Sequence, residues 1–306
     1  MIATAPDPLW AVFVERSLSF WAFEYSFVVT TLLACVLTGL LGGVIGVHLV
    51  LQRLSLLGDT VGHATLPGLA LAFLVLGTGT SAWLLLGGMV TAALGAWAVA
   101  VLAGLPRTRP DAALAIVLSV FFGAGLVILS LVQRGATASQ GQVMAFLLGN
   151  AAAVTPAQLQ VLLAVTVALV AGVVVCGRWL VALALDPGLL VAQGRSPGMV
   201  RAGFLLAIAL AVVVSIRVVG AVLVAAMLII PASTALLVTR RLSGTLALSA
   251  VLGALAGVLG AWVSYVVPGA STGPSMVLAS AVLFAVTLAG RGLLRHRRVA
   301  HRRGRR

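Results

Sequence analysis

The chain has 306 residues, of which 62% are hydrophobic and only 8% are charged. Soluble domains carry about 25% charged residues, so this chain has too little polar surface to remain dissolved in water. The composition therefore excludes a soluble globular domain and predicts an integral membrane protein.

All 19 basic residues are arginines, because the sequence contains no lysine. A phosphate-binding P-loop needs its lysine, and a Schiff-base enzyme needs a lysine amine, so this chain can build neither. We therefore expect a non-catalytic chain, with any ATP-driven step carried by a separate partner.

The formal net charge of +13 is concentrated at the end of the chain, where eight arginines lie between Arg291 and Arg306. A basic segment directly after an apolar run is typical of a cytoplasmic anchor beside anionic lipid headgroups. The sequence therefore predicts a basic cytoplasmic tail over 295–306 and no nucleic-acid partner.

Apolar runs long enough to cross a hydrocarbon core of about 30 Å recur along the chain. The aromatic segment 9–24 carries three charges, so we expect an interfacial helix within an N-terminal segment 1–25. The candidate spans are 26–51, 60–77, 82–104, 112–133, 157–185, 199–216, 218–238, 243–267 and 275–294. The sequence thus predicts an all-α polytopic membrane protein with about nine transmembrane helices, in a domain over 26–294.

The arginines between the spans indicate the orientation. With the tail inside, the inner loops hold Arg53, Arg107, Arg109, Arg178, Arg195, Arg201, Arg240 and Arg241, and the outer segments hold Arg16, Arg134 and Arg217. This excess predicts an outer N-terminus. Merging the two runs at Arg217 would give eight spans and fits the arginine distribution less well.

Small and sulfur-bearing residues within the spans favour packing roles. Three glycine pairs have a spacing of four, at 39 and 43, 42 and 46, and 253 and 257, which lets helices approach closely. We expect ordinary packing within the chain from them, in preference to a dimer interface. Cys35 and Cys176 both lie in apolar runs, where we expect packing and no disulfide.

Asp59 is the acidic residue that topology and loops do not explain, because it opens a span. A carboxylate within a membrane costs about 2.5–3.5 kcal/mol on insertion scales, and such residues usually have a function. His63 follows at i+4, which places both side chains on one helix face about 6 Å apart. An oxygen and an imidazole nitrogen together suit manganese, iron or zinc.

Three further points qualify this pair. Asp59 could instead cap the helix and hydrogen-bond Thr60 or His63 without any ligand. Because two ligands are too few for a metal site, His48 is a possible third ligand, and a second copy of the chain is another source. Pro67 and Gly68 could break the helix beyond the pair.

The depth of the pair is also open, since Arg53, assigned inside, precedes Asp59 by only six residues, about 9 Å of helix. An irregular segment over 55–58 would place the pair deeper in the membrane.

An ordered set of segments carries a resemblance. Residues 42–70 contain Gly-Asp-Thr-Val-Gly-His over 58–63, and further segments are 110–125, Phe-Leu-Leu-Gly-Asn over 146–150, Asp186-Pro187 with Gly194, 219–235 and 272–278. Together they resemble the permease subunits of ABC-type zinc, manganese and iron importers, the ABC-3 family, over roughly 9–294.

The resemblance implies a type II importer permease that forms a dimer, here expected to be a homodimer. It implies two cytoplasmic ABC ATPase subunits and an extracytoplasmic metal-binding protein as partners. It also implies that Asp59 and His63 are metal ligands on the translocation path. The loop near 186–198, with Asp186, Pro187 and Gly194, would couple to the ATPase.

The chain departs from the family pattern at two places. Gly62 stands where a serine often precedes the histidine, and Met144 and Ala145 stand where polar residues are frequent.

The sequence hypothesis is therefore a permease that moves a divalent transition metal across the cytoplasmic membrane of a prokaryote, with ATP used by its partner. A gradient-driven carrier, an ABC permease for a vitamin or haem, and a membrane scaffold without transport are the alternatives.

Overall fold

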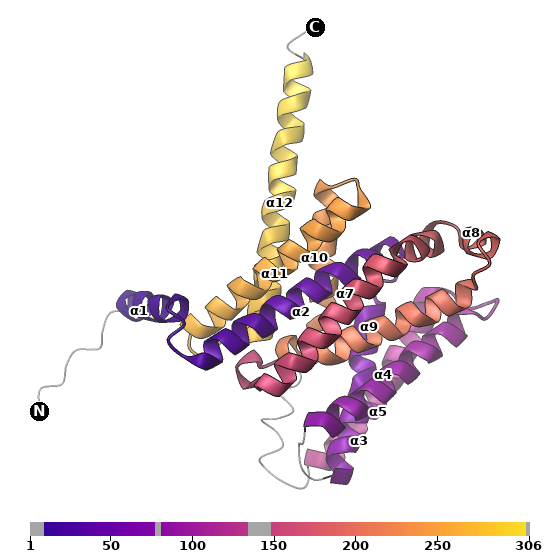
Figure 1. The fold of residues 1–306 in the computed structure, drawn as a ribbon, viewed down its shortest axis with the longest axis horizontal. Helices are drawn as coiled ribbons and strands as arrows, with labels where there is room; N and C mark the ends of the chain where they lie inside the picture. The colour runs from indigo at the N-terminus through magenta and orange to yellow at the C-terminus, as the bar shows by residue number, and fades with distance from the viewer. Residues whose placement is uncertain (1–8, 77–80, 134–147, 304–306) are drawn as a thin grey trace, which may run out of the picture.

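The computed structural model describes residues 9–76, 81–133 and 148–303, and all regular structure within them is helical (Figure 1). The helices are α1 (Leu9–Trp21), α2 (Ser26–Leu51), α3 (Leu57–Leu76), α4 (Ser81–Ala103), α5 (Pro110–Gln133), the 3-10 turn η1 (Ala151–Ala153), α7 (Pro156–Leu185), α8 (Pro187–Ala192), α9 (Pro197–Val219), α10 (Val224–Val238), α11 (Leu242–Val266) and α12 (Thr272–Arg303). The predicted all-α class is confirmed.

Each of the nine predicted spans contains one helix. Seven helices in the described part of the chain are long and apolar enough to cross a membrane, namely α2, α4, α5, α7, α9, α11 and α12. The other two are α3, which has 20 residues but carries the polar pair, and α10, which has only 15. The predicted number of about nine therefore corresponds to seven long apolar helices, the more polar α3 and the short α10.

Helices α2 and α9 form the centre of the bundle. More than half of the apolar window of each is buried, 56% for α2 and 61% for α9, against 17% for α7. Figure 1 shows α2 beside α11 on one side and α7 on the other. The peripheral helices instead expose leucine and valine side chains, as expected of a surface that faces lipid.

Glycines hold α2 directly against α11. A Cβ atom on Gly39 would collide with the carbonyl group of Gly253, and one on Gly253 would collide with that of Gly39. One turn further along, the Ser249 hydroxyl donates a hydrogen bond to the Gly43 carbonyl oxygen over 2.7 Å. We call this contact the α2–α11 seam. It confirms that the spaced glycines serve packing within the chain.

The two cysteines also pack as expected. Cys35 is fully buried, and its backbone lies against Gly257 of the seam. Cys176 is partly exposed on α7, and both thiols are free.

A non-helical turn over 220–223 separates α9 from α10, and Gly220 begins it with a φ of +96°. Two other motif segments meet this turn. The Asn150 backbone N–H donates to the Arg217 carbonyl oxygen over 2.9 Å, and Gly273 lies directly against the Val219 carbonyl. Three of the segments that carried the resemblance therefore converge in space.

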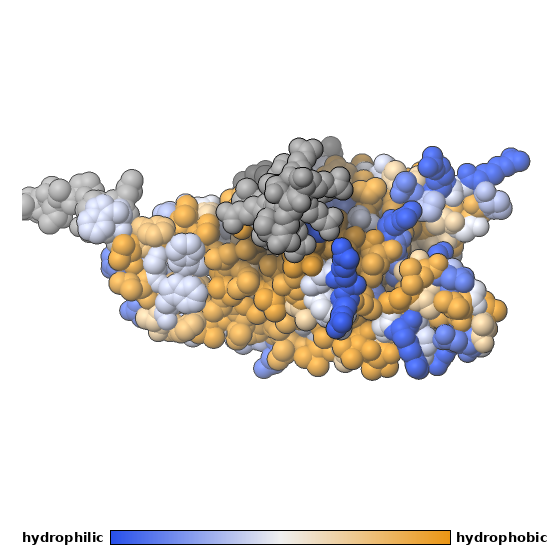
Figure 2. All heavy atoms as spheres, turned by 90° about the horizontal axis from the view of Figure 1, so that it is seen from above, coloured by the Kyte–Doolittle hydropathy of each residue, from blue (hydrophilic) through white to orange (hydrophobic). Residues whose placement is uncertain are grey.

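Hydrophilic residues gather at one end of the molecule, and hydrophobic residues cover its middle (Figure 2). At the end where α2 stops, α3 begins and α8 lies, Arg53, Arg109 and Arg201 line one cavity. We call this the arginine-rich end.

Candidate functional site

Asp59 and His63 lie in the first two turns of α3. Asp59 is in the first turn, where the positive end of the helix dipole stabilises a carboxylate. Its Oδ1 lies 3.4 Å from Nε2 of His63, so the predicted i, i+4 pairing is present. The Asp59 side chain is 36% exposed and that of His63 is 12% exposed. The carboxylate is thus open on one side, and the imidazole stands behind it.

The surroundings of the pair fix the imidazole and leave its second nitrogen unused. The His63 ring packs edge-on against Phe122 of α5, with 4.6 Å between ring centroids. Its Nδ1 is buried without a hydrogen-bond partner. The Thr60 hydroxyl donates to the backbone carbonyls of Leu56 and Leu114. Thr60 therefore does not donate to Asp59, whereas the contact of Asp59 with His63, which the capping alternative also includes, is present.

Helix α3 continues through Pro67 to Leu76, so the expectation that Pro67 and Gly68 break it is wrong. The proline ring instead packs beside Gly125 of α5, which leaves room for it. Proline has no N–H group to donate to the carbonyl four residues earlier, which is that of His63. The backbone at His63 therefore lacks its usual helical donor.

The pair lies near the arginine-rich end and not at the middle of the bundle. Helix α3 already begins at Leu57, so the irregular segment expected over 55–58 does not extend to Gly58. The tight connection before it includes Arg53 with a φ of +57°. Only one to two helical turns separate this connection from Asp59 and His63.

Gly62 brings the α9–α10 turn against the helix that carries the pair. A Cβ atom on Gly62 would lie 3.0 Å from the Ala221 carbonyl oxygen and 3.2 Å from Val224 Cγ1. A serine here would need those neighbours to shift. The departure from the family pattern at Gly62 therefore has a packing reason, and it places non-helical backbone beside His63.

His48 does not join the pair. Its ring is fully buried in α2 and lies edge-on to Phe204 of α9, 6.3 Å between centroids, with both nitrogens unpartnered. In the described residues, no three histidine, cysteine, aspartate or glutamate side chains come together as metal ligands. The expectation that His48 supplies a third ligand is therefore wrong.

The predicted coupling residues form one short hairpin around α8. Asp186 caps α8, and its Oδ1 accepts a hydrogen bond from the Gly188 N–H over 2.8 Å. Pro187 occupies the first helical position, where its fixed φ is favourable. Gly194 has a φ of +69° and ends the helix, and the Arg195 N–H reaches back to the Leu190 carbonyl over 2.8 Å.

Comparisons with known proteins identify the family of this chain. Residues 24–291 match the ABC 3 transport family. The chain belongs to that family. Together with the seven apolar spans, this makes it a multi-pass protein of the prokaryotic cell membrane.

Two proteins named for metal transport are similar over most of the chain. The zinc transport system membrane protein TroC of Treponema pallidum is 38% identical over 78% of this chain and 80% of its own length. The manganese transport system membrane protein MntC of Bacillus subtilis is 34% identical over 81% of this chain. The match covers 57% of the length of that MntC protein.

A solved structure has the same fold. PsaBC from Streptococcus pneumoniae, in complex with Fab, superposes with a TM-score of 0.76 at 27% identity. The match covers 90% of this chain and 94% of that chain. Met144, Ala145 and Phe146, which lie in or next to one of the motif segments, are outside the residues that the structure describes.

Sequence reasoning missed how α8 is held in this ABC 3 family chain. Leu190 is fully buried in a small cluster with Trp179, and the Arg195 guanidinium lies 4.1 Å above the Trp179 ring centroid. On the other side, Leu189 is 48% and Val191 is 64% exposed. The sequence of α8 does not show which of its aliphatic side chains faces inward, because Leu190 is buried by Trp179, which lies on another helix.

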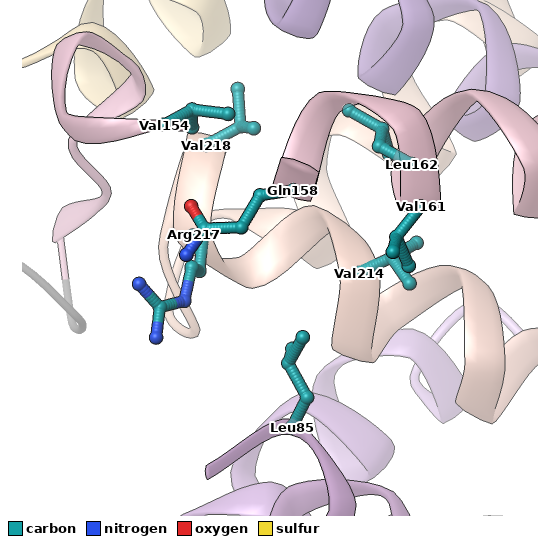
Figure 3. A pocket seen from close by; sticks show the side chains of 8 residues that line it. All are labelled: Leu85, Val154, Gln158, Val161, Leu162, Val214, Arg217 and Val218. Atoms are coloured by element: carbon teal, nitrogen blue, oxygen red, sulfur yellow. The ribbon is translucent and has the colours of Figure 1, made fainter. Parts of the chain in front are cut away.

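A small pocket surrounds Arg217 at the far end of α9, and Figure 3 shows it with Gln158 of α7 and Leu85 of α4. Its volume is about 20 Å³, which holds about one water molecule. A vitamin or a haem cannot occupy it. Arg217 lies in the last turn of α9, which continues to Val219, so α9 and α10 divide at Gly220 and not at Arg217 as predicted.

Proposed function

We propose that this chain is the membrane-spanning permease subunit of an ATP-driven importer for a divalent transition metal. Membership of the ABC 3 transport family supports ATP as the energy source over an ion gradient. The relatives named for manganese and zinc transport favour one of these two ions as the cargo. Iron remains a hypothesis from the sequence.

The separation of Asp59 Oδ1 and His63 Nε2 is the observation that carries the proposal. Their distance is 3.4 Å. A tetrahedral ion with ligands at about 2.1 Å holds neighbouring ligand atoms about 3.4 Å apart. One ion can therefore bridge the two side chains with little rearrangement.

The incompleteness of the pair suits a cargo site. A resident structural metal has a closed set of four protein ligands, whereas a transported ion must leave. The remaining ligands could come from water, which reaches the partly exposed Asp59 carboxylate, or from a second copy of the chain. In a homodimer, two carboxylates and two imidazoles meeting near the shared axis would complete a transient tetrahedral site.

The partners follow from the same proposal. Two cytoplasmic ABC ATPase subunits would supply ATP hydrolysis, because this chain has no lysine for a P-loop. An extracytoplasmic metal-binding protein would deliver the ion. The arginine-rich end and the tail over 295–306 would face the cytoplasm, and the segment 1–25 would lie at the outer interface.

The α8 hairpin, within the loop near 186–198, would couple to the ATPase. Its Asp186 cap, Pro187 and Gly194 hold a defined shape, and Leu189 and Val191 offer exposed apolar contacts. We expect Val191→Asp to weaken ATPase binding and leave folding unchanged, because the side chain contributes little to the core. Val191→Thr, of similar shape, is the matched control. Unchanged ATPase retention in pull-downs of Val191→Asp would contradict this docking role.

Reconstituted transport tests the function directly. The purified complex in proteoliposomes should accumulate radioactive manganese or zinc when ATP is present and no ion gradient exists. Uptake that needs a proton or sodium gradient and ignores ATP would establish the gradient-driven carrier instead. ATP-driven uptake of a vitamin or haem, without metal, would establish the other alternative. A scaffold predicts no flux of any of these.

A further inference from the structure

A cavity of about 480 Å³ opens at the arginine-rich end, apart from the Asp59 and His63 side chains. It lies where seven helices end or begin: α2, α3, α4, α5, α7, α8 and α9. Its volume exceeds that of a single phosphate group by several fold. The cavity therefore has room for a polar headgroup together with part of a larger molecule.

The polar residues that line the cavity are mainly arginines, and their guanidinium groups form no ion pair in the described part of the chain. Arg53, Arg109 and Arg201 line it, against the single carboxylate of Asp111. In the described residues the only ion pair within 4.0 Å is that of His63 with Asp59. None of the three guanidinium groups makes a hydrogen bond within the described chain. Together they offer forked donors that match the oxygens of a phosphate.

The rest of the lining supports the same ligand. Gln52 lines the cavity, and its side-chain Nε2 is buried without a hydrogen-bond partner, so a further donor awaits an acceptor. Leu54, Leu57, Leu183 and Leu205 form apolar walls beside these donors. A site with a cationic mouth and leucine walls suits a molecule with an anionic head and a hydrocarbon body.

We propose that this cavity binds the phosphate headgroup of an anionic phospholipid, with the upper part of an acyl chain against its leucines. The membrane supplies such a molecule at the level where the helices end, and basic pockets between transmembrane helices bind lipid phosphates for this reason. Three arginines would repel the divalent cargo, so the cavity is not a further metal site. The proposal does not depend on the direction or the substrate of transport.

Occupancy has a consequence for the α8 hairpin. Pro187 of α8 and Ala184 of α7 also line the cavity. A bound lipid would therefore fill space beneath the hairpin and restrict its movement. We expect anionic lipid to stabilise the arginine-rich end together with α8.

Native mass spectrometry of the full chain in uncharged detergent tests the proposal. Dioleoylphosphatidylglycerol and dioleoylphosphatidylcholine are titrated separately, and bound lipid is counted. We expect phosphatidylglycerol to bind at least about tenfold more tightly than phosphatidylcholine, and the double variant Arg109→Gln/Arg201→Gln to lose this preference, because two charge-assisted hydrogen bonds are removed. Arg53→Asn gives an independent variant, since asparagine tolerates the positive φ at that position.

Arg107→Gln is the matched control. Arg107 lies with Arg109 on the connection between α4 and α5, but it does not line the cavity. It should keep the preference for phosphatidylglycerol. Equal binding of both lipids to the unmodified chain would overturn the proposal without any variant, so a variant that fails to fold leaves the test intact. An equal loss in Arg107→Gln would also overturn it. Competition by millimolar inorganic phosphate that displaces all bound lipid would assign the cavity to a soluble anion instead.

Discussion

The α2–α11 seam and the first turns of α3 use similar small residues for opposite purposes. In the seam, Gly39 and Gly253 bring two backbones together so closely that no side-chain atom fits between them. On α3, Gly62 also admits a neighbouring backbone, but its helix keeps Asp59 partly exposed on another face. One region is closed and apolar, and the other retains an accessible charge.

The difference teaches which part of the bundle can act as a frame and which part can exchange a ligand. A seam of direct backbone contacts has no space for water or ions, so we expect it to stay fixed while other helices move. The first turns of α3 lie beside a non-helical turn and carry an incomplete set of ligands. The central contrast is therefore between a rigid frame and an open binding face.

Disrupting the seam should have the largest effect. We expect Gly39→Leu to prevent recovery of folded protein from membranes, because its side chain has no space against the Gly253 carbonyl. Gly172→Leu on α7 is the control, since a Cβ there meets nothing within 4 Å. Monodisperse protein in size-exclusion chromatography for Gly39→Leu would show that the seam is not a fixed frame.

A smaller clash on α3 should have an intermediate effect. A Cβ on Gly62 would lie 3.0 Å from the Ala221 carbonyl oxygen, so Gly62→Ala requires a small shift of the α9–α10 turn. We expect a loss of about 1–3 kcal/mol, the usual cost of overpacking, seen as a lower thermal midpoint in detergent. Gly203→Ala, with open space around its Cβ, should leave the midpoint unchanged. Equal midpoints for both variants would mean that this contact is not tight.

A substitution in α2 that touches neither Asp59 nor His63 should have the smallest effect on metal uptake. His48 lies in α2, fully buried and without a partner for either ring nitrogen. We expect His48→Gln to leave the metal content and metal uptake of the complex unchanged, because the ring does not approach Asp59 or His63. A fall in metal uptake comparable to that of an Asp59 variant would restore His48 as a ligand.

Local features of the structure were predictable from the sequence because they depend on spacing along one helix. The apolar runs predicted the helices. The i, i+4 spacing predicted the contact of Asp59 with His63, and the spaced glycines predicted close contacts between helices. The proline and glycine that bound the α8 hairpin also act through local backbone preferences.

Features that depend on distant contacts were not predictable. Helix α3 continues through Pro67, and the close packing of its ring beside Gly125 depends on another helix. In the described residues the His48 ring packs edge-on to Phe204 and joins no cluster of ligands with the pair, which the sequence of α2 alone does not encode. Likewise, Arg53, Arg109 and Arg201 had only a topological meaning in the sequence, because the cavity that they share forms where three separate connections meet the start of α9.

The most direct test of the central claim is metal flux through Asp59 variants. Asp59→Asn keeps the shape of the side chain and removes its charge, and His63→Gln keeps a polar side chain and removes the imidazole. In ATP-driven proteoliposomes, we expect each to reduce manganese or zinc uptake by at least about 10–100-fold, since even outer partners of metal ligands cost this much. The complex should still assemble and hydrolyse ATP. Uptake at the unmodified rate in both variants would contradict the account.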